Sequence, residues 1–313
     1  MNTQMYKPEG FYAGADGREC FYSQTTLEKA LATGKILEAQ ATLCDSEFSL
    51  YVDLGSMKGK IPRSEAVYQP SGEEVKDIAV ITRVGKTVAF KVIGFAVENG
   101  ETVAILSRKE AQKSCLANYL MTLCPGDVVD AQVTHLEPFG AFVDIGCGVI
   151  SLLSIDCISV SRISHPRDRF YTGMYIKTVI KSIDRETSRI YVSHKELLGT
   201  WEENVSKFEI GQTIAGVIRS VEPYGVFVEL APNLAGLAEY REGVFSGQRA
   251  AVYIKNIIPE KMKVKLVLVD AYSSSAPSDY RFEYFETKSH IDKFVYSPSV
   301  CDRVIMTDFA DEI

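Results

Sequence analysis

Apolar and polar residues alternate in three related stretches of the chain. Residues 137–146 read EPFGAFVDIG, residues 222–231 read EPYGVFVELA, and a weaker copy, FSLYVDLG, begins at Phe48. Because successive side chains of a strand point to opposite faces, this alternation predicts one β-strand per copy. The chain is therefore expected to contain three copies of one β-rich unit.

Each predicted strand has an apolar inner face and an outer face that carries one ring and one carboxylate. The inward residues of the second copy are Ala141, Val143 and Ile145. Phe142 is the outward ring of that copy. The outward carboxylates of the three copies are Asp53, Asp144 and Glu229. A lone carboxylate cannot serve as both general acid and general base, so we interpret these three as polar positions of the scaffold.

The second unit shows the complete order of elements. Its predicted strands cover residues 127–137, 139–145, 149–153, 174–183 and 189–193. One irregular connection separates the third strand from the fourth. Five strands in about 70 residues suit a small closed barrel of the OB type. The predicted fold class is all-β, with three tandem five-stranded OB-fold barrels joined by short helical linkers.

Turn and helix signals divide the chain into seven segments. They are an N-terminal extension with a short helix (1–34), a diverged barrel (35–110), a helical linker (111–123), the best-formed barrel (124–196), a linker (197–210), a shortened barrel (211–270) and an acidic tail (271–313). Thr25 or Thr26 is expected to cap the first helix and Gly34 to end it. Trp201 is expected to anchor the second linker against a barrel. The sequence leaves open whether the tail forms strands or folds against the third barrel.

Composition excludes several classes of protein. The apolar and charged fractions, 46% and 24%, are those of a globular chain. Neither a signal peptide pattern nor an apolar run of ~20 residues occurs, so we expect a cytoplasmic protein without membrane contact. The seven cysteines form no CxxC pair and are expected to be reduced and mostly buried thiols. The histidines show no catalytic or metal-binding spacing, and the VGKT stretch at residues 84–87 lacks the first glycine of a phosphate loop. No catalytic residue, metal or small-molecule cofactor is therefore expected.

Charge is distributed unevenly along the chain. The net charge of −7 argues against general coating of nucleic acid. Between residues 162 and 195, however, eight basic residues outnumber three acidic ones, which gives a regional charge of +5. The eight are Arg162, Arg167, Arg169, Lys177, Lys181, Arg185, Arg189 and Lys195. With His165 and His194 in the same span, this region is suited to phosphate contacts; a solvated face of mixed charge is the alternative.

The second unit resembles a known RNA-binding module. Residues 126–195, which open with GDVVDAQVTHLEPFGAFVDIG and close with VIKSIDRETSRIYVSHKEL, resemble the S1 RNA-binding domain, the OB-fold repeat of bacterial ribosomal protein S1. Residues 211–270 are similar to a shortened copy and residues 35–110 to a diverged one. The whole chain is similar to short bacterial S1-like proteins that are associated with translation. The resemblance implies single-stranded RNA as the partner, with the small ribosomal subunit or mRNA as the candidate target.

The exposed rings are the first candidate contacts, since single-strand binders stack bases on such rings. Phe142 and Phe227 are the strongest candidates. Phe139 and Tyr224 precede them by three positions, next to glycines that permit a bend. Strict alternation would separate the two rings of a pair, but the resemblance implies that both line the RNA face. The alternative is that one ring of each pair plugs the end of its barrel.

The resemblance also implies polar contacts. An Asp and an Arg around the loop before the last strand match Asp184 and Arg189, whereas Ser154 stands where the family has a histidine. Lys263 takes the place of Arg189 in the third unit. The predicted RNA-binding residues are Phe139, Phe142, Ser154, Lys181, Asp184, Arg185, Arg189, Tyr224, Phe227, Lys263, Phe48 and Tyr51. The second unit keeps most of this set and is expected to contribute most to binding.

The sequence thus predicts a non-catalytic protein that binds single-stranded RNA in translation or RNA handling. The alternative is a protein-interaction module that docks on the ribosome, RNA polymerase or an RNA-degrading enzyme. The overall acidity and the missing histidine favour this alternative, because both weaken the case for phosphate contacts.

Overall fold

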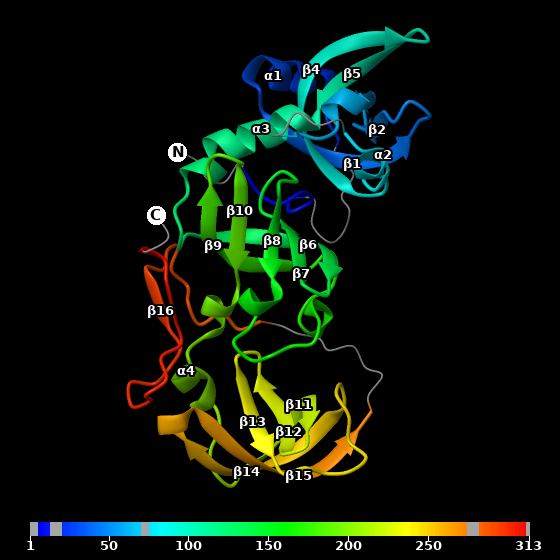
Figure 1. Cartoon of the computed structure of the whole chain (residues 1–313). Helices are drawn as coiled ribbons and strands as arrows, with labels where there is room; N and C mark the ends of the chain where they lie inside the picture. The colour runs from blue at the N-terminus through cyan, green and yellow to red at the C-terminus, as the bar shows by residue number, and fades with distance from the viewer. Residues whose placement is uncertain (1–5, 13–20, 70–74, 274–281, 311–313) are drawn as a thin grey trace.

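Three closed five-stranded barrels follow one another along the chain (Figure 1). The computed structural model describes residues 6–12, 21–69, 75–273 and 282–310. In each barrel the third and fifth strands pair in parallel, and this pairing completes the ring of strands that the other, antiparallel pairs build. The predicted all-β class of tandem OB-fold barrels is confirmed.

Each barrel takes its strands from one continuous part of the chain. The first contains β1 (Ile36–Cys44), β2 (Leu50–Asp53), β3 (Lys58–Ile61), β4 (Thr87–Glu98) and β5 (Glu101–Ser107). The second contains β6 (Val128–Glu137), β7 (Gly140–Asp144), β8 (Ile150–Ser154), β9 (Tyr175–Asp184) and β10 (Arg189–Ser193). The third contains β11 (Thr213–Glu222), β12 (Gly225–Ala231), β13 (Leu234–Ala238), β14 (Arg249–Ile258) and β15 (Lys263–Tyr272). The predicted strands of the second barrel match these bounds to within one residue.

Short helices fill the connections. The α-helices are α1 (Gln24–Thr33), α2 (Asp77–Ile81), α3 (Arg108–Asn118) and α4 (Trp201–Val205). The 3-10 helices are η2 (Arg63–Glu65), η3 (Leu120–Thr122), η4 (Ile155–Cys157), η5 (Pro166–Asp168), η6 (Lys195–Leu198) and η7 (Pro259–Lys261). The predicted caps of the first helix were wrong, because the hydroxyl of Ser23 accepts the hydrogen bond from the Thr26 amide. Gly34 ends that helix in a left-handed conformation, as predicted, and Trp201 is buried in the core next to the third barrel, as expected.

The alternation seen in the sequence fixes the barrel interiors. Ala141 and Val143 are fully buried and Ile145 nearly so, and Val226 and Val228 occupy the same inner face in the third barrel. The first strand of each barrel changes register opposite the motif strand, between Val133 and His135 in the second barrel. The same irregularity occurs in β1 and β11. Such a bulge leaves the residue that follows it on the outer surface beside the motif ring.

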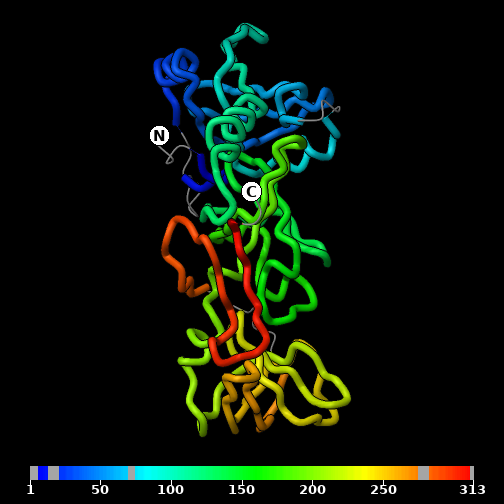
Figure 2. The backbone as a smooth tube through the Cα atoms, turned by 60° about the vertical axis from the view of Figure 1, so that its left-hand side comes forward, coloured from blue at the N-terminus to red at the C-terminus, as the bar shows by residue number. Residues whose placement is uncertain are grey.

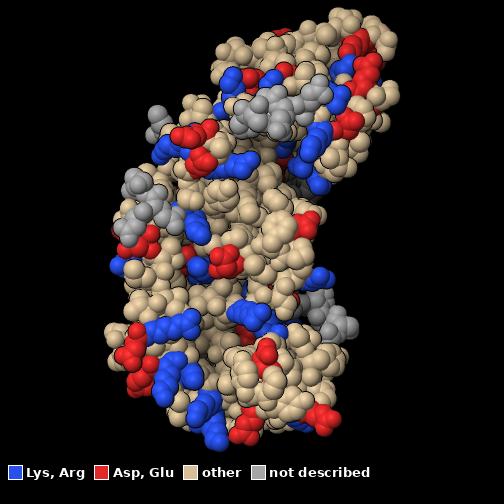
Figure 3. Space-filling model, viewed as in Figure 1, with Lys and Arg blue, Asp and Glu red and all other residues tan. Residues whose placement is uncertain are grey.

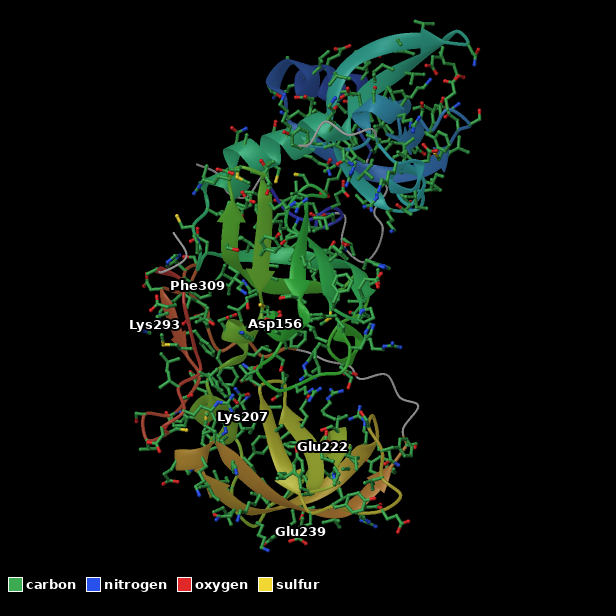
Figure 4. All side chains as sticks on the ribbon, viewed as in Figure 1. Asp156, Lys207, Glu222, Glu239, Lys293 and Phe309 are labelled. Carbon is green, nitrogen blue, oxygen red and sulfur yellow. The ribbon has the colours of Figure 1, made fainter. Side chains whose placement is uncertain are left out.

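The tail runs back along two barrels (Figure 2). It forms a hairpin of β16 (Lys293–Val295) and β17 (Met306–Asp308), on which Figure 4 labels Lys293 and Phe309. Phe294 and Phe309 are buried in one cluster with Val179 of the second barrel and Ile218 of the third. The tail therefore forms strands, and it packs against both the third barrel and the second.

A buried ion cluster joins the second barrel to the third. Glu229, at 4% exposure, accepts two hydrogen bonds from Arg169, at 2.6 and 2.9 Å. It also accepts one of 2.8 Å from Arg219, which pairs with Asp168 at 3.2 Å. Burial of a charge requires such complete pairing. Glu229 therefore lies on the outer face of its strand with a structural role, as predicted, but the neighbouring barrel covers that face and buries it.

The junction between the first and second barrels uses the same strand position. Asp144, at 1% exposure, accepts a hydrogen bond of 2.7 Å from the amide of Glu9. The Glu9 carboxylate in turn accepts hydrogen bonds of 2.6 and 2.9 Å from the buried Arg108 and one of 3.0 Å from the amide of Ala89. Asp144 thus also lies on the predicted outer face of its strand and is buried there by the joint. Asp53 of the first barrel is exposed, as predicted.

This junction holds more carboxylates than the buried arginine can neutralise. Burial, together with the neighbouring Glu9, raises the pKa of Asp144 to about 7. The same two causes raise the pKa of Glu38 to about 7. Both carboxyls therefore hold a proton more tightly in the folded protein than in the unfolded chain.

Substitution of Glu229 by Gln is expected to lower the free energy of unfolding by about 3–5 kcal/mol, because it leaves the buried guanidinium of Arg169 without a carboxylate and removes one of the two that pair with Arg219. Denaturant unfolding followed by fluorescence of Trp201, which lies in the adjoining core, measures the change. Asp53→Asn is the matched control at the exposed equivalent position and should change stability by less than about 0.5 kcal/mol. Equal effects of the two substitutions would contradict a role for the ion cluster.

Substitution of Glu38 by Gln is expected to stabilise the protein at alkaline pH. A carboxyl whose pKa rises from 4.5 to about 7 on folding costs stability progressively as pH rises through that window, and an amide does not. The variant should match the parent near pH 5 and exceed it by on the order of 1–3 kcal/mol at pH 8. Denaturant titrations at both pH values measure this difference, in which contributions from other groups cancel. A difference that does not change with pH would refute the assignment.

Candidate nucleic-acid interface

Two pairs of rings project from equivalent places on the second and third barrels. Phe139 is 55% exposed and Tyr224 is 69% exposed. The ring centroids of Phe139 and Phe142 lie 6.1 Å apart, edge to face, and those of Tyr224 and Phe227 lie 6.1 Å apart in the same arrangement. Both rings of each pair therefore meet on one surface, and neither Phe139 nor Tyr224 plugs its barrel.

The glycine between the two rings has a steric role. A Cβ atom on Gly140 would lie 2.5 Å from the carbonyl oxygen of Leu153, and one on Gly225 would lie 2.5 Å from that of Ala238. No side chain fits at either position without displacing the adjacent strand. The glycine therefore lets the motif strand lie close to the next strand, β8 in the second barrel and β13 in the third, just before the second ring of each pair.

A row of side chains crosses the outer face of the second barrel. Strand pairing places Phe142 opposite Leu152, and Leu152 beside Tyr191. On the other side of Phe142 lies the exposed His135, whose ring stacks on Phe142 with centroids 6.4 Å apart. His135 and Tyr191 were not among the predicted contacts. The sequence carried a signal for Tyr191, since alternation in RIYVS places it on the outer face.

The third barrel repeats this row with a different balance of side chains. Phe227 lies opposite Leu237, which pairs with the exposed Lys265. Ser220 takes the place of His135. Lys263 is exposed at the start of β15. This face thus has two rings and two lysines, whereas the second barrel has four rings and one arginine.

The first barrel covers its rings with cations. Lys60 lies over the ring of Tyr51 at 5.7 Å and pairs with Glu98 at 2.9 Å. The guanidinium of Arg63 lies over the ring of Phe48 at 5.4 Å. A base that stacks on either ring must displace a cation, so the geometry favours the other two barrels as the place of base stacking.

The loop between β9 and β10 is organised by Asp184. Its carboxylate accepts hydrogen bonds from the amides of Glu186 and Thr187 and from the Thr187 hydroxyl. These bonds lower the pKa of Asp184. Arg189 faces Asp184 across the strand pair and is exposed. Asp184 therefore shapes the loop that presents Arg189.

The remaining predicted contacts lie around the same barrel. The Ser154 hydroxyl is bonded to Asp156 and lowers the pKa of that carboxyl. The Lys181 amine lies 3.6 Å from the Cys157 sulfur. Arg185 donates a hydrogen bond of 2.7 Å to the carbonyl of Met121, before the barrel begins. These side chains flank the row of rings, and their role in binding stays a prediction.

Two members of the basic span do not reach solvent. Arg169 is buried and forms an ion pair with Glu229. His194 is fully buried among Phe170, Phe282 and Tyr284, and burial lowers its pKa to about 4. The expectation that both are suited to phosphate contacts was wrong, because the third barrel covers one and the tail covers the other.

A cavity of about 580 Å³ opens beside the row of the second barrel. Phe142, Leu152 and Tyr191 line one side, and Thr187, Ser188 and Arg189 contribute polar groups. The cavity brings the predicted residues Phe142 and Arg189 together. Its remaining wall comes from residues 67–69 of the first barrel and from α3.

Surface charge also differs between the barrels. Lys and Arg gather over the lower part of the molecule in Figure 3, where the third barrel and α4 lie, whereas both signs are mixed over the first barrel. Within the described part of the chain, no cluster of three or more metal-ligating side chains occurs and no helix is long and apolar enough to span a bilayer. The described cysteines are free thiols, and Cys20 lies outside the described residues.

Comparison with known proteins agrees with this geometry. Residues 123–195 match the family model for the S1 RNA binding domain. Over 228 residues, 70% of this chain, the sequence is 36% identical to small ribosomal subunit protein bS1 of Staphylococcus aureus, and it is 33% identical over 218 residues to the bS1 homolog of Bacillus subtilis. The chain spans about half the length of these relatives, 55% and 54%. A multidomain Streptococcus pneumoniae protein with nucleic acid binding domains aligns with 77% of this chain and 75% of its own at 15% identity, with a TM-score of 0.26.

Proposed function

Since this chain is an S1-domain protein similar to bacterial ribosomal protein S1, we propose that it is a non-catalytic, cytoplasmic protein that binds single-stranded RNA in translation. The observation that carries the proposal is a pair of rings, one exposed and one half-buried, at the same place on two barrels. The similarity to small ribosomal subunit protein bS1 supports the small ribosomal subunit as the setting.

The rings bind bases without requiring a particular sequence. Every base has an aromatic face, and stacking on a protein ring contributes ~1–3 kcal/mol per base. Edge-to-face pairs such as Phe139 with Phe142 hold each other in position, so that little side-chain freedom is lost on binding. His135 and Tyr191 extend the platform to either side.

The cations at the start of the last strand supply the electrostatic part of binding. Arg189 and Lys263 stand at equivalent places beside the two platforms. Each is suited to one phosphate of a strand whose bases stack on the rings. Because the two sites are tethered in one chain, an RNA long enough to reach both binds more tightly than either site alone permits.

The double substitution Phe142→Ala and Phe227→Ala is expected to weaken binding of single-stranded RNA by on the order of 2 kcal/mol or more, because each barrel loses a stacking surface. Fluorescence anisotropy with a labelled single-stranded oligonucleotide measures the affinity. Phe21→Ala, which removes a ring of 71% exposure outside the second and third barrels, is the matched control and should leave affinity unchanged. Unaltered affinity of the double variant would rule out the stacking platform.

The double substitution Arg189→Gln and Lys263→Gln is expected to reduce the salt dependence of binding. Each phosphate contact to a single strand contributes about 0.7 to the slope of log affinity against log salt concentration, so the slope should fall by about 1.4. The affinity is measured between low and moderate salt with the same oligonucleotide. Lys76→Gln together with Lys113→Gln removes two exposed charges of the first barrel and α3 and should preserve the slope. An unchanged slope in the test variant would exclude these two residues as phosphate contacts.

A further inference from the structure

The cavity beside the second barrel is built from two barrels. One side is the outer face of β7, β8 and β10, and the other is the segment Val67–Gln69, which follows η2 of the first barrel, together with Gln112 and Leu116 of α3. Its volume of about 580 Å³ lies within the range of ~300–1,000 Å³ that is usual for sites that enclose small organic groups. No residue of the first barrel was predicted from the sequence to contribute to this site.

The wall from the first barrel is held in place by buried hydrogen bonds. The Gln112 side chain accepts one of 2.8 Å from the Tyr68 amide and donates one of 2.8 Å to the carbonyl of Gly148 in the second barrel. Arg108 donates to the carbonyls of Ala66 and Gly148 in the same way, at 3.2 and 3.4 Å. The segment is therefore preorganised against the second barrel, and a ligand does not have to order it.

The lining matches the chemistry of a nucleotide. Phe142, Leu152 and Tyr191 offer an apolar and aromatic side for the face of a base, and Arg189 offers a cation for a phosphate. The Gln69 amide on the opposite wall carries both donors and an acceptor, as a base edge requires. Because Phe142 belongs both to the platform and to the cavity, a strand that stacks on the platform reaches the cavity directly.

We propose that one unpaired nucleotide of the bound RNA inserts into this cavity, so that the first barrel supplies one wall of the RNA site of the second barrel. This inference rests on the proposed function. It assigns the first barrel a part in RNA recognition that does not use its own rings. It also makes that nucleotide the position at which base identity affects affinity, since it alone is enclosed by polar groups.

Filling the cavity tests the proposal. Ile150→Trp places a large ring in the lining, and Ile93→Trp makes the same change at a residue of identical exposure, 44%, on β4 outside the cavity. The first variant is expected to weaken binding of a single-stranded oligonucleotide about tenfold, and the second to leave it unchanged. Gln69→Ala, which leaves the core intact, is expected to weaken binding about threefold. Thermal unfolding of each variant verifies that the fold is retained.

Photocrosslinking gives a second readout that does not depend on a variant. The full chain is irradiated with an oligonucleotide that carries 4-thiouridine, and the crosslinked peptides are identified by mass spectrometry. Crosslinks within residues 67–69 are expected. Crosslinks confined to the second and third barrels would overturn this inference and leave the proposed function standing. The same conclusion would follow if Ile150→Trp and Gln69→Ala kept the parental affinity while the double variant Phe142→Ala and Phe227→Ala lost binding. Retained binding by the double ring variant would overturn both.

Discussion

The arrangement of the molecule depends on a buried carboxylate at the end of the repeated strand. In the second and third barrels this position, Asp144 and Glu229, faces the preceding barrel and is buried by it. A desolvated carboxylate is tolerated only when donors surround it with good geometry. Rotation of one barrel against the next would separate these partners, so the joints have one low-energy orientation. In the first barrel the equivalent residue, Asp53, faces solvent.

The two joints are stabilised differently. Between the second and third barrels, the ion cluster is supplemented by apolar packing of the tail, with Phe294, Tyr296 and Phe309 buried across both. Between the first and second, Glu9 lies beside Asp144 and pairs with Arg108 and Arg83, and burial together with Glu9 raises the pKa of Asp144 to about 7. The second and third barrels therefore behave as one body whose platforms keep a fixed separation, and the upper joint is the more sensitive to pH.

The sequence predicted what depends on local periodicity. Strand alternation has a period of two, so the strands and their inner faces could be placed to within a residue from EPFGAFVDIG and its neighbours. The same alternation identified Phe142 and Phe227 as outward rings. The convergence of each pair was implied by the resemblance to the S1 domain, and the glycines next to Phe139 and Tyr224 permitted it. The part that failed depends on neighbours far away in the chain. A polar residue on the outer face of a strand is indistinguishable from a solvated one until the adjoining barrel is known, as Asp144, Glu229 and Arg169 illustrate.

His135 and Tyr191 were missed for another reason. His135 lies on the strand beside the motif, and Tyr191 lies one strand further away, beyond Leu152; only the register of the barrel places both in one row with Phe142. The bulge before His135 changes the alternation by one residue, so a simple count along the strand assigns its face wrongly. A row of side chains that crosses several strands can therefore be predicted only when the strand register is known, and the sequence of one strand does not give that register.

The register also explains why the first barrel differs in role. In the fifth strand of each barrel, one position lies two residues before the row of side chains. This position is Arg189 in the second barrel, Lys263 in the third and the buried Val103 in the first. Its hairpin ends with Glu98 opposite Glu101, and these carboxylates pair with Lys60 and Lys58, so both lysines already have a partner within the protein. An exposed cation over a ring contributes only ~0.5–1 kcal/mol, less than a stacked base, so the covering lysine and arginine alone would not prevent stacking. The lack of a phosphate contact decides the matter: this barrel is better suited to support its neighbour's site than to form its own.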